Sequence, residues 1–464
     1  MRDLAPDLLN RLRAHHQIHV LFGWETFDTA QRHSLIDQLS PIDLDEIDRL
    51  FERRDEPVAL PAKEKIAPVP MIPHDALTSA DRHAGEEMLA HGQVAVLLVA
   101  GGQGTRLGFD KPKGMFPIGP VSNKSLFQIH AEKILALSRR YGKPVPFLIM
   151  TSPATHSDTL AFFEQHRYFG LPKTEVFFFQ QGTMPAVDLL AGKLLMEKPG
   201  VLFTGPNGHG GTLTALADSG LLDTMKQRGI RSVFYFQVDN PLVKIADPAF
   251  LGRHVLTNSE ASSKAIEKAY PKEKMGVLAL VDGKCGIIEY IDMPDDLLNA
   301  TGSDGKLLHR AGSPAIHIFD INFLARITQG ATRLPYHIAR KKVSCIDEEG
   351  NPVVPTMENA LKFELFVFDA LPLAERTLVI EALRSEEFSP VKNADGVDSP
   401  ATAKRDMVNL AGKWLDAAGA KVPRDEKGDV TVPVEVSPLL ALDKEELAAR
   451  IKKGKDIDGP TYLE

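Results

Sequence analysis

The chain has 464 residues, which is long enough for a large hydrophobic core and for two or three domains. Its formal net charge of -8 argues against a nucleic-acid scaffold, which usually carries a basic surface, so any anion must be bound by local cations. The cysteines, Cys285 and Cys345, are too few for a disulfide framework or a structural zinc cluster, and we expect both to be buried packing residues in a reducing compartment.

The beginning of the sequence does not resemble a targeting segment. Residues 1–7 lack the apolar core of a signal peptide, and no stretch of the chain approaches the length of a membrane span. We therefore expect a cytoplasmic protein with no membrane partner and no nucleic-acid partner. The sequence carries no sign of an oligomeric state.

Residues 1–85 are expected to form helices followed by an extended connector. Ser40 and Pro41 predict a helix start, as cap and first-turn proline, ahead of an apolar stripe at helical spacing. The stripe consists of Leu44, Ile47, Leu50 and Phe51. The connector is marked by the prolines Pro57, Pro61, Pro68, Pro70 and Pro73. Because this segment shows no catalytic constellation, we expect it to dock onto the core.

From about residue 90 the sequence alternates between short apolar runs and amphipathic segments, which is typical of an α/β fold with a mostly parallel sheet and helices on both faces. Residues 125–141 are expected to form one of the helices, ended by Gly142. The predicted strands are 94–100, 147–150, 176–179 and 233–238. Ligands of open α/β sheets bind beyond the carboxyl ends of the strands, so residues that follow these strands are candidate site residues.

The remainder of the chain has a different pattern. Residues 277–320 contain shorter apolar segments between polar turns, which predicts an antiparallel extension of the sheet. The final segment is rich in lysine and interrupted by prolines, and alternation predicts a strand through Val430, Val432, Val434 and Val436. We therefore expect three parts, comprising residues 1–85, 86–400 and 401–464.

A glycine-rich loop directly follows the first predicted strand. Gly101, Gly102 and Gly104 have no Cβ, so they can adopt otherwise strained dihedrals and let backbone N–H groups approach anionic oxygens. Arg106 and Lys113 then add positive charge. This combination indicates a binding site for a nucleoside triphosphate.

Two commoner glycine motifs do not fit this loop. The dinucleotide-binding fingerprint requires glycine where Leu107 stands, and no acidic residue suited to a ribose is placed downstream. The Walker loop requires glycine where Asn123 stands, directly before Lys124 and Ser125. The loop is therefore of another kind.

Residues 101–108, together with Pro112 and Lys113, resemble the G-G-x-G-T-R-L-G…P-K signature of the sugar-nucleotide pyrophosphorylases. The details look most like the uridylyltransferases of the UDP-N-acetylglucosamine pyrophosphorylase type. Further segments similar to that family keep its order and span most of the chain, namely 178–182, 238–244, 288–290, 362–369 and 388–395. The resemblance implies a Rossmann-like nucleotidyltransferase core in residues 86–400, with an N-terminal helical segment and a small C-terminal domain.

The resemblance also implies a reaction. A phosphate oxygen of a sugar 1-phosphate would attack the α-phosphorus of UTP, giving a UDP-sugar and pyrophosphate, with Mg²⁺ as cofactor. Arg106 would hold the β- and γ-phosphates, Lys113 would neutralise charge at the α-phosphate, and Lys392 would meet the sugar phosphate. The backbone at the uridine and its phosphates would be that of Val99, Ala100, Gly101 and Gly102.

Other nucleotide and metal contacts are implied in the same way. Gln181 would pair with the edge of uracil, although a strand-end amide can also cap backbone. Gly208 and Lys362 would contact the nucleotide. Asp239 follows the predicted strand 233–238 and would bind the Mg²⁺ that UTP carries, while an Asx turn with Asn240 and Pro241 is a compatible alternative.

The sugar-binding residues leave the identity of the sugar open. Glu289 and Tyr290 match a pair that contacts sugar hydroxyls in the family. His209 and Ser313, however, stand where the N-acetylglucosamine enzymes carry asparagine, and a Gly-His-Gly sequence looks more like UDP-glucose and broad UDP-sugar pyrophosphorylases. We expect N-acetylglucosamine 1-phosphate as substrate, with glucose or galactose 1-phosphate as the alternative. A non-catalytic sensor of UTP or UDP-sugars is an alternative of another class.

Overall fold

The computed structural model describes residues 4–56, 61–330 and 334–464, so the connector proline Pro57 lies outside the described residues. By its internal contacts the chain divides into two compact units. The smaller unit comprises Met1–Leu60, Gly182–Thr212 and Leu334–Asp369, and the larger unit comprises Pro61–Gln181, Leu213–Arg333 and Ala370–Glu464. Each unit is therefore assembled from three separate stretches of sequence. The three sequence ranges expected above remain a prediction about domains.

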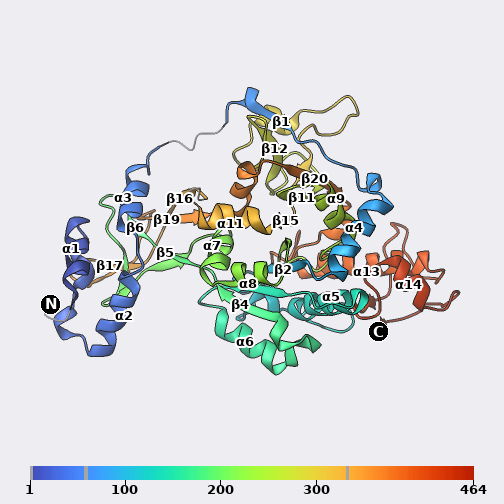
Figure 1. Cartoon of the computed structure of the whole chain (residues 1–464), viewed down its shortest axis with the longest axis horizontal. Helices are drawn as coiled ribbons and strands as arrows, with labels where there is room; N and C mark the ends of the chain where they lie inside the picture. The colour runs from blue at the N-terminus through green and yellow to red at the C-terminus, as the bar shows by residue number, and fades with distance from the viewer. Residues whose placement is uncertain (1–3, 57–60, 331–333) are drawn as a thin grey trace. The chain divides into compact units, whose positions relative to one another are not determined.

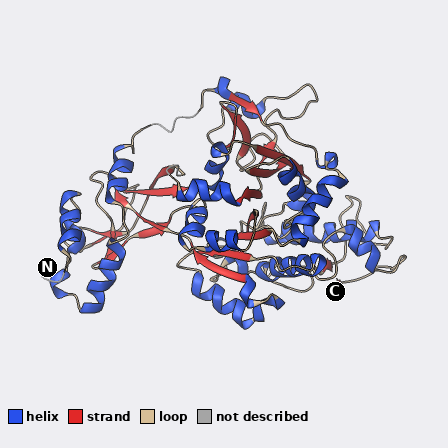
Figure 2. Cartoon of the chain, viewed as in Figure 1, coloured by secondary structure: helices blue, strands red, loops and turns tan. Residues whose placement is uncertain are grey.

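The larger unit is built on an α/β sheet that has 11 strands among the described residues (Figures 1 and 2). The strand order is β1-β12-β14-β11-β15-β10-β2-β3-β4, with β13 beside β12 and β20 beside β11. The strands are β1 (Ile66–Pro68), β2 (Val94–Val99), β3 (Phe147–Thr151), β4 (Val176–Gln180), β10 (Ser232–Gln237), β11 (Ala261–Glu267), β12 (Val277–Val281), β13 (Lys284–Ile288), β14 (Ala311–Gly312), β15 (His317–Asp320) and β20 (Thr377–Ala382).

Helices accompany these strands along the chain of the larger unit. They are α4 (Ser79–Ala90), α5 (Leu126–Tyr141), α6 (His156–Gln165), α7 (Gly211–Asp218), α8 (Leu221–Gln227), α9 (Pro248–Leu256), α10 (Asp295–Asn299), α11 (Ile321–Gln329), α12 (Arg384–Glu387), α13 (Pro400–Ala417) and α14 (Lys444–Arg450). Helix α5 begins where the Ser125 side chain accepts the Gln128 N–H and ends at Gly142, whose φ is 68°, as the sequence predicts. The predicted α/β architecture is confirmed.

Strands β10, β2, β3 and β4 run parallel, which matches the four strands predicted from the apolar runs. Leu97 of β2 pairs with Tyr235 of β10 on one side and with Leu148 of β3 on the other. All three side chains are fully buried, because helices or loops cover both faces of this part of the sheet. The carboxyl ends of these strands consequently lie along one edge.

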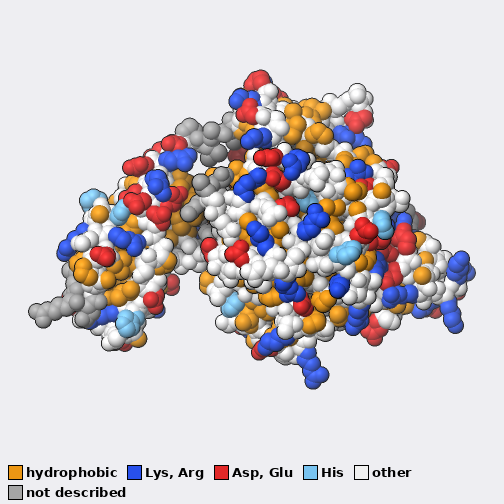
Figure 3. All heavy atoms as spheres, in the orientation of Figure 1, with side chains coloured by type: hydrophobic (Ala, Val, Ile, Leu, Met, Phe, Trp, Pro, Cys, Tyr) orange, Lys and Arg blue, Asp and Glu red, His pale blue; other side chains and the backbone are white. Residues whose placement is uncertain are grey.

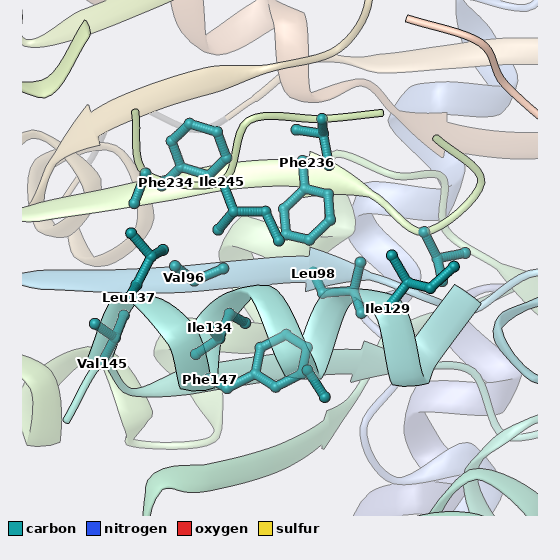
Figure 4. Close-up of a cluster of buried hydrophobic side chains, with 14 of the residues drawn as sticks. Val96, Leu98, Ile129, Ile134, Leu137, Val145, Phe147, Phe234, Phe236 and Ile245 are labelled. Carbon is teal, nitrogen blue, oxygen red and sulfur yellow. The ribbon is translucent and has the colours of Figure 1, made fainter. Parts of the chain in front are cut away.

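The largest hydrophobic cluster of this unit joins the parallel strands to α5 (Figure 4). The side chains drawn there include Val96, Leu98, Ile129, Ile134, Leu137, Phe147, Phe234 and Phe236. Phe147 and Phe234 are completely buried, and burying a side chain of this size stabilises the fold by roughly 1.5–3 kcal/mol. The cluster therefore holds rigid the strands from which the candidate site loops emerge.

The remaining part of the sheet is largely antiparallel. Strand β15 pairs antiparallel with β10 and β11, and β12 pairs antiparallel with β13, β14 and β1. The expected antiparallel extension in residues 277–320 is thus confirmed. The expected connector also contributes to the sheet, because Ile66 of β1 pairs with Val281 of β12.

Helices α4 and α9 cross at two glycines. A Cβ on Gly252 of α9 would lie 1.6 Å from the Asp81 carbonyl oxygen of α4, and a Cβ on Gly85 would lie 1.9 Å from the Pro248 carbonyl oxygen. Such distances are far inside van der Waals contact, so only glycine lets the two backbones approach this closely. Neither glycine is at a positive φ, and therefore close approach rather than a turn explains both.

The C-terminal segment folds around a small core of its own. Helices α13 and α14 pack with strands β21 (Val434–Val436) and β22 (Thr461–Leu463) around residues such as Leu415 and Leu447. The predicted strand through Val430 and Val432 is wrong in extent, since β21 begins only at Val434. Pro433 has no N–H for a ladder, which is consistent with a strand that starts directly after it.

Among its described residues, the smaller unit combines three α-helices with short strands (Figure 1). Helices α1 (Pro6–Ala14), α2 (Thr29–Leu39) and α3 (Leu44–Glu52) bury Leu12, Leu35 and Ile47 against Val187, Leu361 and Phe363. The strands are β5 (Thr183–Pro185), β6 (Val187–Asp188), β7 (Met196–Lys198), β8 (Val201–Leu202), β9 (Thr204–Pro206), β16 (Tyr336–Lys341), β17 (Cys345–Ile346), β18 (Pro352–Val353) and β19 (Ala360–Leu365). The docking expected for the N-terminal helices takes place on these strands.

The predicted start of α3 is wrong. The helix begins at Leu44, and its cap is Asp43, whose carboxylate accepts the Glu46 N–H at 2.9 Å. Ser40 instead follows the end of α2, where its N–H and hydroxyl both donate to the Ile36 carbonyl oxygen. The apolar stripe predicted from Leu44 onward is nevertheless the buried face of the helix.

The two cysteines differ in burial. Cys285 is buried, as expected, whereas Cys345 is partly exposed, so the expectation of a buried packing residue is wrong for Cys345. Both are free thiols. Within the described ranges, no helix is long and apolar enough to cross a membrane. On the face shown in Figure 3, acidic and basic side chains are interspersed.

Candidate active site

Three predicted site segments follow parallel strands of the larger unit. The glycine-rich loop follows β2, Gln181 follows β4, and Asp239 follows β10 by one residue. In the parallel part of the sheet β10 and β2 are neighbours, and β3 lies between β2 and β4. Their carboxyl ends therefore present the three segments at one edge, as the rule for open α/β sheets requires.

The glycine-rich loop turns back on itself. The Gly104 N–H donates to the Lys111 carbonyl at 2.9 Å, and the Lys113 N–H donates to the Gly102 carbonyl at 3.0 Å. Gly104 is required by this turn, because a Cβ there would lie 2.7 Å from the Phe109 carbonyl oxygen. A Cβ on Gly102 would meet no protein atom within 4 Å, so the backbone at Gly102 faces open space. The fold thus brings Lys113 next to an open stretch of backbone.

Arg106 lies at the exposed side of this loop. Its guanidinium has no ion pair or hydrogen bond among the described residues, and the side chain is exposed. A free guanidinium, with one positive charge and several N–H donors, is suited to binding a polyphosphate. The structure thus leaves Arg106 available for the part that the resemblance implies.

Lys113 and Asp239 form an ion pair at the end of β10. The Lys113 Nζ lies 3.7 Å from the Asp239 carboxylate, and only 17% of the lysine side chain and 13% of the aspartate side chain are exposed. The Asx turn suggested for this segment is made by Asn240, whose side-chain oxygen accepts the Leu242 N–H. The Asp239 carboxylate is therefore directed to Lys113 rather than to the turn.

Gln181 is held beside the glycine loop. Its N–H donates to the Thr151 carbonyl of β3 at 2.7 Å, and the residue is buried. A Cβ on Gly101 would lie 3.1 Å from the Gln181 side-chain oxygen, which shows how closely the two residues approach. Ser152, which the sequence reasoning missed, donates its hydroxyl to the Gly101 carbonyl at 2.8 Å. Since Ser152 follows β3 directly, the rule for strand ends was a signal that could have found it.

Lys392 lies on a loop that is bonded to Asp239. The Val391 N–H donates to the Asp239 carbonyl at 2.9 Å, and the Lys392 N–H donates to the Asp398 carbonyl at 2.7 Å. The Lys392 Nζ is 3.8 Å from the Asp398 carboxylate. Asp398 has a positive φ of 56°, an uncommon conformation outside glycine that marks a strained turn. The fold therefore brings Lys392 and Asp239 together from distant parts of the chain.

Ser313 and Glu289 both lie close to Gly276 in the antiparallel part of the sheet. The Ser313 N–H donates to the Gly276 carbonyl at 2.9 Å, and a Cβ on Gly276 would lie 3.7 Å from a Glu289 side-chain oxygen. Tyr290 follows Glu289 directly after β13 and is partly exposed. Three of the residues predicted to bind the sugar are thus gathered in one region of the larger unit.

The loop that contains Gly208 and His209 belongs to the smaller unit and is bonded to the end of β19. The Leu365 N–H donates to the Asn207 carbonyl at 2.7 Å, and the Gly210 N–H donates to the Leu365 carbonyl at 2.8 Å. Gly208 has a φ of 83°, and a Cβ on it would lie 2.3 Å from the Leu365 carbonyl oxygen. Both conformation and close approach therefore require glycine at this position.

His209 is held by the same connection. Its Nδ1 accepts the Val367 N–H at 3.2 Å, and its ring stacks on Phe366 with 5.3 Å between centroids. Burial lowers the pKa of His209 to about 4, so the ring is neutral near pH 7 and carries its proton on Nε2. This bond to backbone leaves the Nε2–H of His209 as the donor.

Lys362 also belongs to the smaller unit. A Cβ on Gly205 would lie 2.7 Å from the Lys362 Nζ, and this Nζ sits 5.9 Å from the centroid of the Phe203 ring. In the described part of the chain Lys362 has no carboxylate partner. Its ammonium group is consequently available to an anionic ligand.

Replacing Gly208 by alanine is expected to lower kcat/KM by at least about tenfold and to destabilise the protein. The new methyl group cannot fit against Leu365, so the loop that carries His209 must move. Gly220 provides a matched control, because it has a similar φ of 72° but open space around a Cβ. Steady-state kinetics and urea unfolding of Gly208→Ala and Gly220→Ala would check this, and equal effects of the two substitutions would contradict it.

No group of three or more His, Cys, Asp or Glu side chains is close enough to hold a metal ion in the residues that the structure describes. A metal that binds at Asp239 would therefore need further ligands from substrate and water. This arrangement suits Mg²⁺, which commonly takes one or two carboxylates and completes its shell with phosphate oxygens and water. The Asp239 carboxylate, whose partner is a lysine rather than a second carboxylate, fits this pattern.

Comparison with known proteins supports the same conclusion. The family model described as UTP–glucose-1-phosphate uridylyltransferase matches residues 47–400. The UDP-N-acetylhexosamine pyrophosphorylase-like protein 1 of Xenopus tropicalis is 38% identical over 95% of this chain and 93% of its own length. The UDP-N-acetylglucosamine pyrophosphorylase of Saccharomyces cerevisiae is 39% identical over 85% of this chain and 84% of its own.

A solved structure extends the likeness to the fold. The putative UDP-N-acetylglucosamine pyrophosphorylase of Entamoeba histolytica superimposes with a TM-score of 0.77 at 35% identity, covering 86% of this chain and all of that one. The fold and the loops at its strand ends thus define a nucleotidyltransferase that makes nucleoside-diphosphate sugars. More particularly, the chain belongs to the UTP–glucose-1-phosphate uridylyltransferase family and, within it, to the UDP-N-acetylglucosamine pyrophosphorylases, which are UTP:sugar 1-phosphate uridylyltransferases. The resemblance in the sequence is confirmed.

Proposed function

We propose that the chain transfers the uridylyl group of UTP to N-acetylglucosamine 1-phosphate, forming UDP-N-acetylglucosamine and pyrophosphate. The observation that carries this proposal is the meeting of Lys113, Asp239 and the Lys392 loop at the edge of the parallel strands, in a chain whose relatives bear the corresponding name. A nucleotide and a sugar phosphate are both polyanions. Lys113 pairs with Asp239 and the Lys392 loop is bonded to the Asp239 backbone, and the two lysines would provide positive charge to hold both.

In the proposed reaction a phosphate oxygen of the sugar 1-phosphate forms a bond to the α-phosphorus of UTP. The bond from that phosphorus to the bridging oxygen breaks on the opposite side, and pyrophosphate leaves with the electron pair. Because no covalent intermediate is needed, the protein acts by positioning and by electrostatic stabilisation. Lys113 would stabilise the charge at the α-phosphate, Arg106 would hold the leaving phosphates, and Lys392 would hold the phosphate of the sugar.

The nucleotide would be oriented by groups around the glycine loop. The Gln181 amide has both a donor and an acceptor for the edge of uracil, and its approach to Gly101 supports that role. The backbone from Val99 to Gly102 would lie along the uridine and its phosphates. The roles of Gly208 and Lys362 at the nucleotide, and of His209, Glu289, Tyr290 and Ser313 at the sugar, are carried over from the resemblance.

Asp239 would hold Mg²⁺ together with phosphate oxygens of UTP, and the bound ion would neutralise part of the triphosphate charge. The carboxylate pairs with Lys113 at 3.7 Å, a longer contact than a direct hydrogen bond. We infer that Lys113 is in this way held ready for the α-phosphate. We also propose that the enzyme is located in the cytoplasm.

A panel of substrates tests which sugar 1-phosphate the enzyme prefers. We expect N-acetylglucosamine 1-phosphate to give the highest kcat/KM when pyrophosphate release from UTP and Mg²⁺ is compared with the 1-phosphates of N-acetylgalactosamine, glucose and galactose. The alternative, a preference for glucose or galactose, is favoured by His209, whose Nε2–H is a donor suited to a hydroxyl. A higher kcat/KM for those sugars would contradict the expected preference and assign His209 and Ser313 to specificity.

A further inference from the structure

Asn240 is a buried residue at the end of β10, directly after Asp239, and only 3% of it is exposed. Its Nδ2 donates to the Glu387 carbonyl at 2.7 Å. Its Oδ1 accepts the Ser389 N–H at 3.1 Å and the Leu242 N–H at 3.3 Å. The side-chain amide thus binds a segment that lies 147 residues further along the chain, as well as its own turn.

The bonds to that segment come from the end of helix α12 and from the residues directly after it. The Glu387 carbonyl and the Ser389 N–H bond to the Asn240 side chain, and the Val391 N–H bonds to the Asp239 carbonyl. Glu387 is the last residue of helix α12, and the backbone becomes extended at Phe388, so the Glu387 carbonyl and the Ser389 N–H face the Asn240 amide where the chain leaves the helix. The Asn240 amide, with one donor and one acceptor, therefore binds one backbone carbonyl and one backbone N–H of this segment, as a peptide group would.

The same segment is also held from other directions. The Lys264 Nζ contacts both Glu387 carboxylate oxygens at 2.6 Å and the Asp247 carboxylate at 2.9 Å. The Ser389 hydroxyl donates to the Asp406 carboxylate at 2.7 Å. These side-chain contacts secure the segment to its surroundings, whereas Asn240 joins its backbone to the turn that carries Asp239. Lys392 directly follows Val391, whose N–H donates to the Asp239 carbonyl.

We propose that Asn240 is a positioning residue of the transfer reaction, whose amide sets the place of Lys392 relative to Asp239 and Lys113. This inference rests on the proposed function, in which Lys392 meets the phosphate of the sugar. A cation stabilises a transferring phosphoryl group only when its donors reach the oxygens, and a displacement of about 1 Å can cost about a hundredfold in rate. Asn240 itself touches no reacting atom in this arrangement.

The test compares Asn240→Ala and Asn240→Asp in the full-length protein. Alanine removes all three bonds, whereas aspartate keeps the acceptor oxygen and replaces the Nδ2, which donates to the Glu387 carbonyl, by a second oxygen. We expect both to raise the KM for N-acetylglucosamine 1-phosphate at least about tenfold while the Kd for UTP changes less than about threefold. If alanine prevents folding, aspartate retains the turn bond and provides the same measurement.

Asn409, which is partly exposed, provides a control for the loss of a hydrogen-bonded side-chain amide. Its side chain also makes two hydrogen bonds, to Asp429 and to the Val430 N–H, but these lie within the C-terminal segment. We expect Asn409→Ala to lower stability without changing the KM for the sugar phosphate. An equal rise of this KM in Asn409→Ala and Asn240→Ala would show a general structural effect and overturn the inference.

A double-mutant cycle with Lys392→Ala separates positioning from stability. If Asn240 acts through Lys392, adding Asn240→Ala to Lys392→Ala should raise the KM for the sugar phosphate by less than about twofold more. Fully additive effects of the two substitutions on this KM would overturn the inference but not the proposed function. A normal KM in Asn240→Ala together with a raised KM in Lys392→Ala would have the same meaning. A normal KM in Lys392→Ala would overturn the proposed role of Lys392 and the inference with it.

Discussion

Replacing Lys113 by alanine is expected to lower kcat about a hundredfold while the protein folds normally, because one preorganised cation at the α-phosphate is removed. Among the described residues the Lys113 side chain pairs with Asp239 at 3.7 Å, which is longer than a direct hydrogen bond. Steady-state pyrophosphate release with saturating UTP and sugar phosphate measures this effect. Circular dichroism of the variant shows whether the fold is retained.

Lys111 supplies a matched control for Lys113→Ala. It lies two residues earlier in the same loop, is exposed, and pairs at 3.5 Å with Asp158, also exposed, away from Asp239. We expect Lys111→Ala to keep kcat within about threefold of the unsubstituted protein, since exposed ion pairs contribute little. Near-normal turnover in Lys113→Ala, or an equal loss in both variants, would overturn the role given to Lys113.

A non-catalytic sensor would bind UTP tightly but release no pyrophosphate. The unsubstituted protein would then show no pyrophosphate release with any sugar 1-phosphate of the panel. Family membership argues for the enzyme instead. The retention of Arg106, Lys113, Asp239 and Lys392 does so as well, because binding of uridine alone would not require cations for the leaving phosphates. The substrate panel separates the two outcomes.

Replacing Gly252 by alanine is expected to destabilise the protein by about 3 kcal/mol or more. Helix propensity alone predicts the opposite sign, because alanine stabilises a helix interior by about 1 kcal/mol relative to glycine. Packing should outweigh propensity here, since the added Cβ would lie 1.6 Å from the Asp81 carbonyl oxygen and both atoms belong to helix backbones. Urea unfolding gives the free energy and its sign.

Gly459 is the control for Gly252→Ala. It also lacks a positive φ, and a Cβ on it would meet no atom within 4 Å. We expect Gly459→Ala to change the free energy of unfolding by less than about 0.5 kcal/mol. A stability gain in Gly252→Ala would mean that the crossing of α4 and α9 can open at low cost, contrary to the close approach described above.

Much of the catalytic core could be predicted from local patterns. The apolar runs at 94–100 and 233–238 became parallel strands, and the glycine-rich loop, Gln181 and Asp239 follow strand ends as expected. Such patterns succeed because a strand buried on both faces must be apolar along its length, which short sequence windows reveal. The resemblance of motifs added Lys392 to the predicted site. Without that resemblance, Lys392 would have been interpreted as a solvent-exposed cation.

Other predictions failed where two local signals compete. Ser40 and Asp43 are both good caps, and the carboxylate three residues closer to the apolar stripe caps the helix while Ser40 bonds back to Ile36. Val430 and Val432 alternate like strand residues, but the ladder starts only after Pro433. Cys345 is partly exposed because it begins the two-residue strand β17, both residues of which are only partly buried.

Four parallel strands, the helix at 125–141 and the glycine loop could be predicted from the sequence, because these depend on contacts between near neighbours and on residue type. The resemblance added the charged residues that we propose for the uridylyl transfer. Only the tertiary structure decided which distant groups meet. Asn240 with Glu387 and Ser389, Lys113 with Asp239, and Gly85 and Gly252 with the backbones of opposing helices are examples. Such contacts join segments far apart in sequence, and their geometry follows from the packing of the whole core rather than from any local pattern.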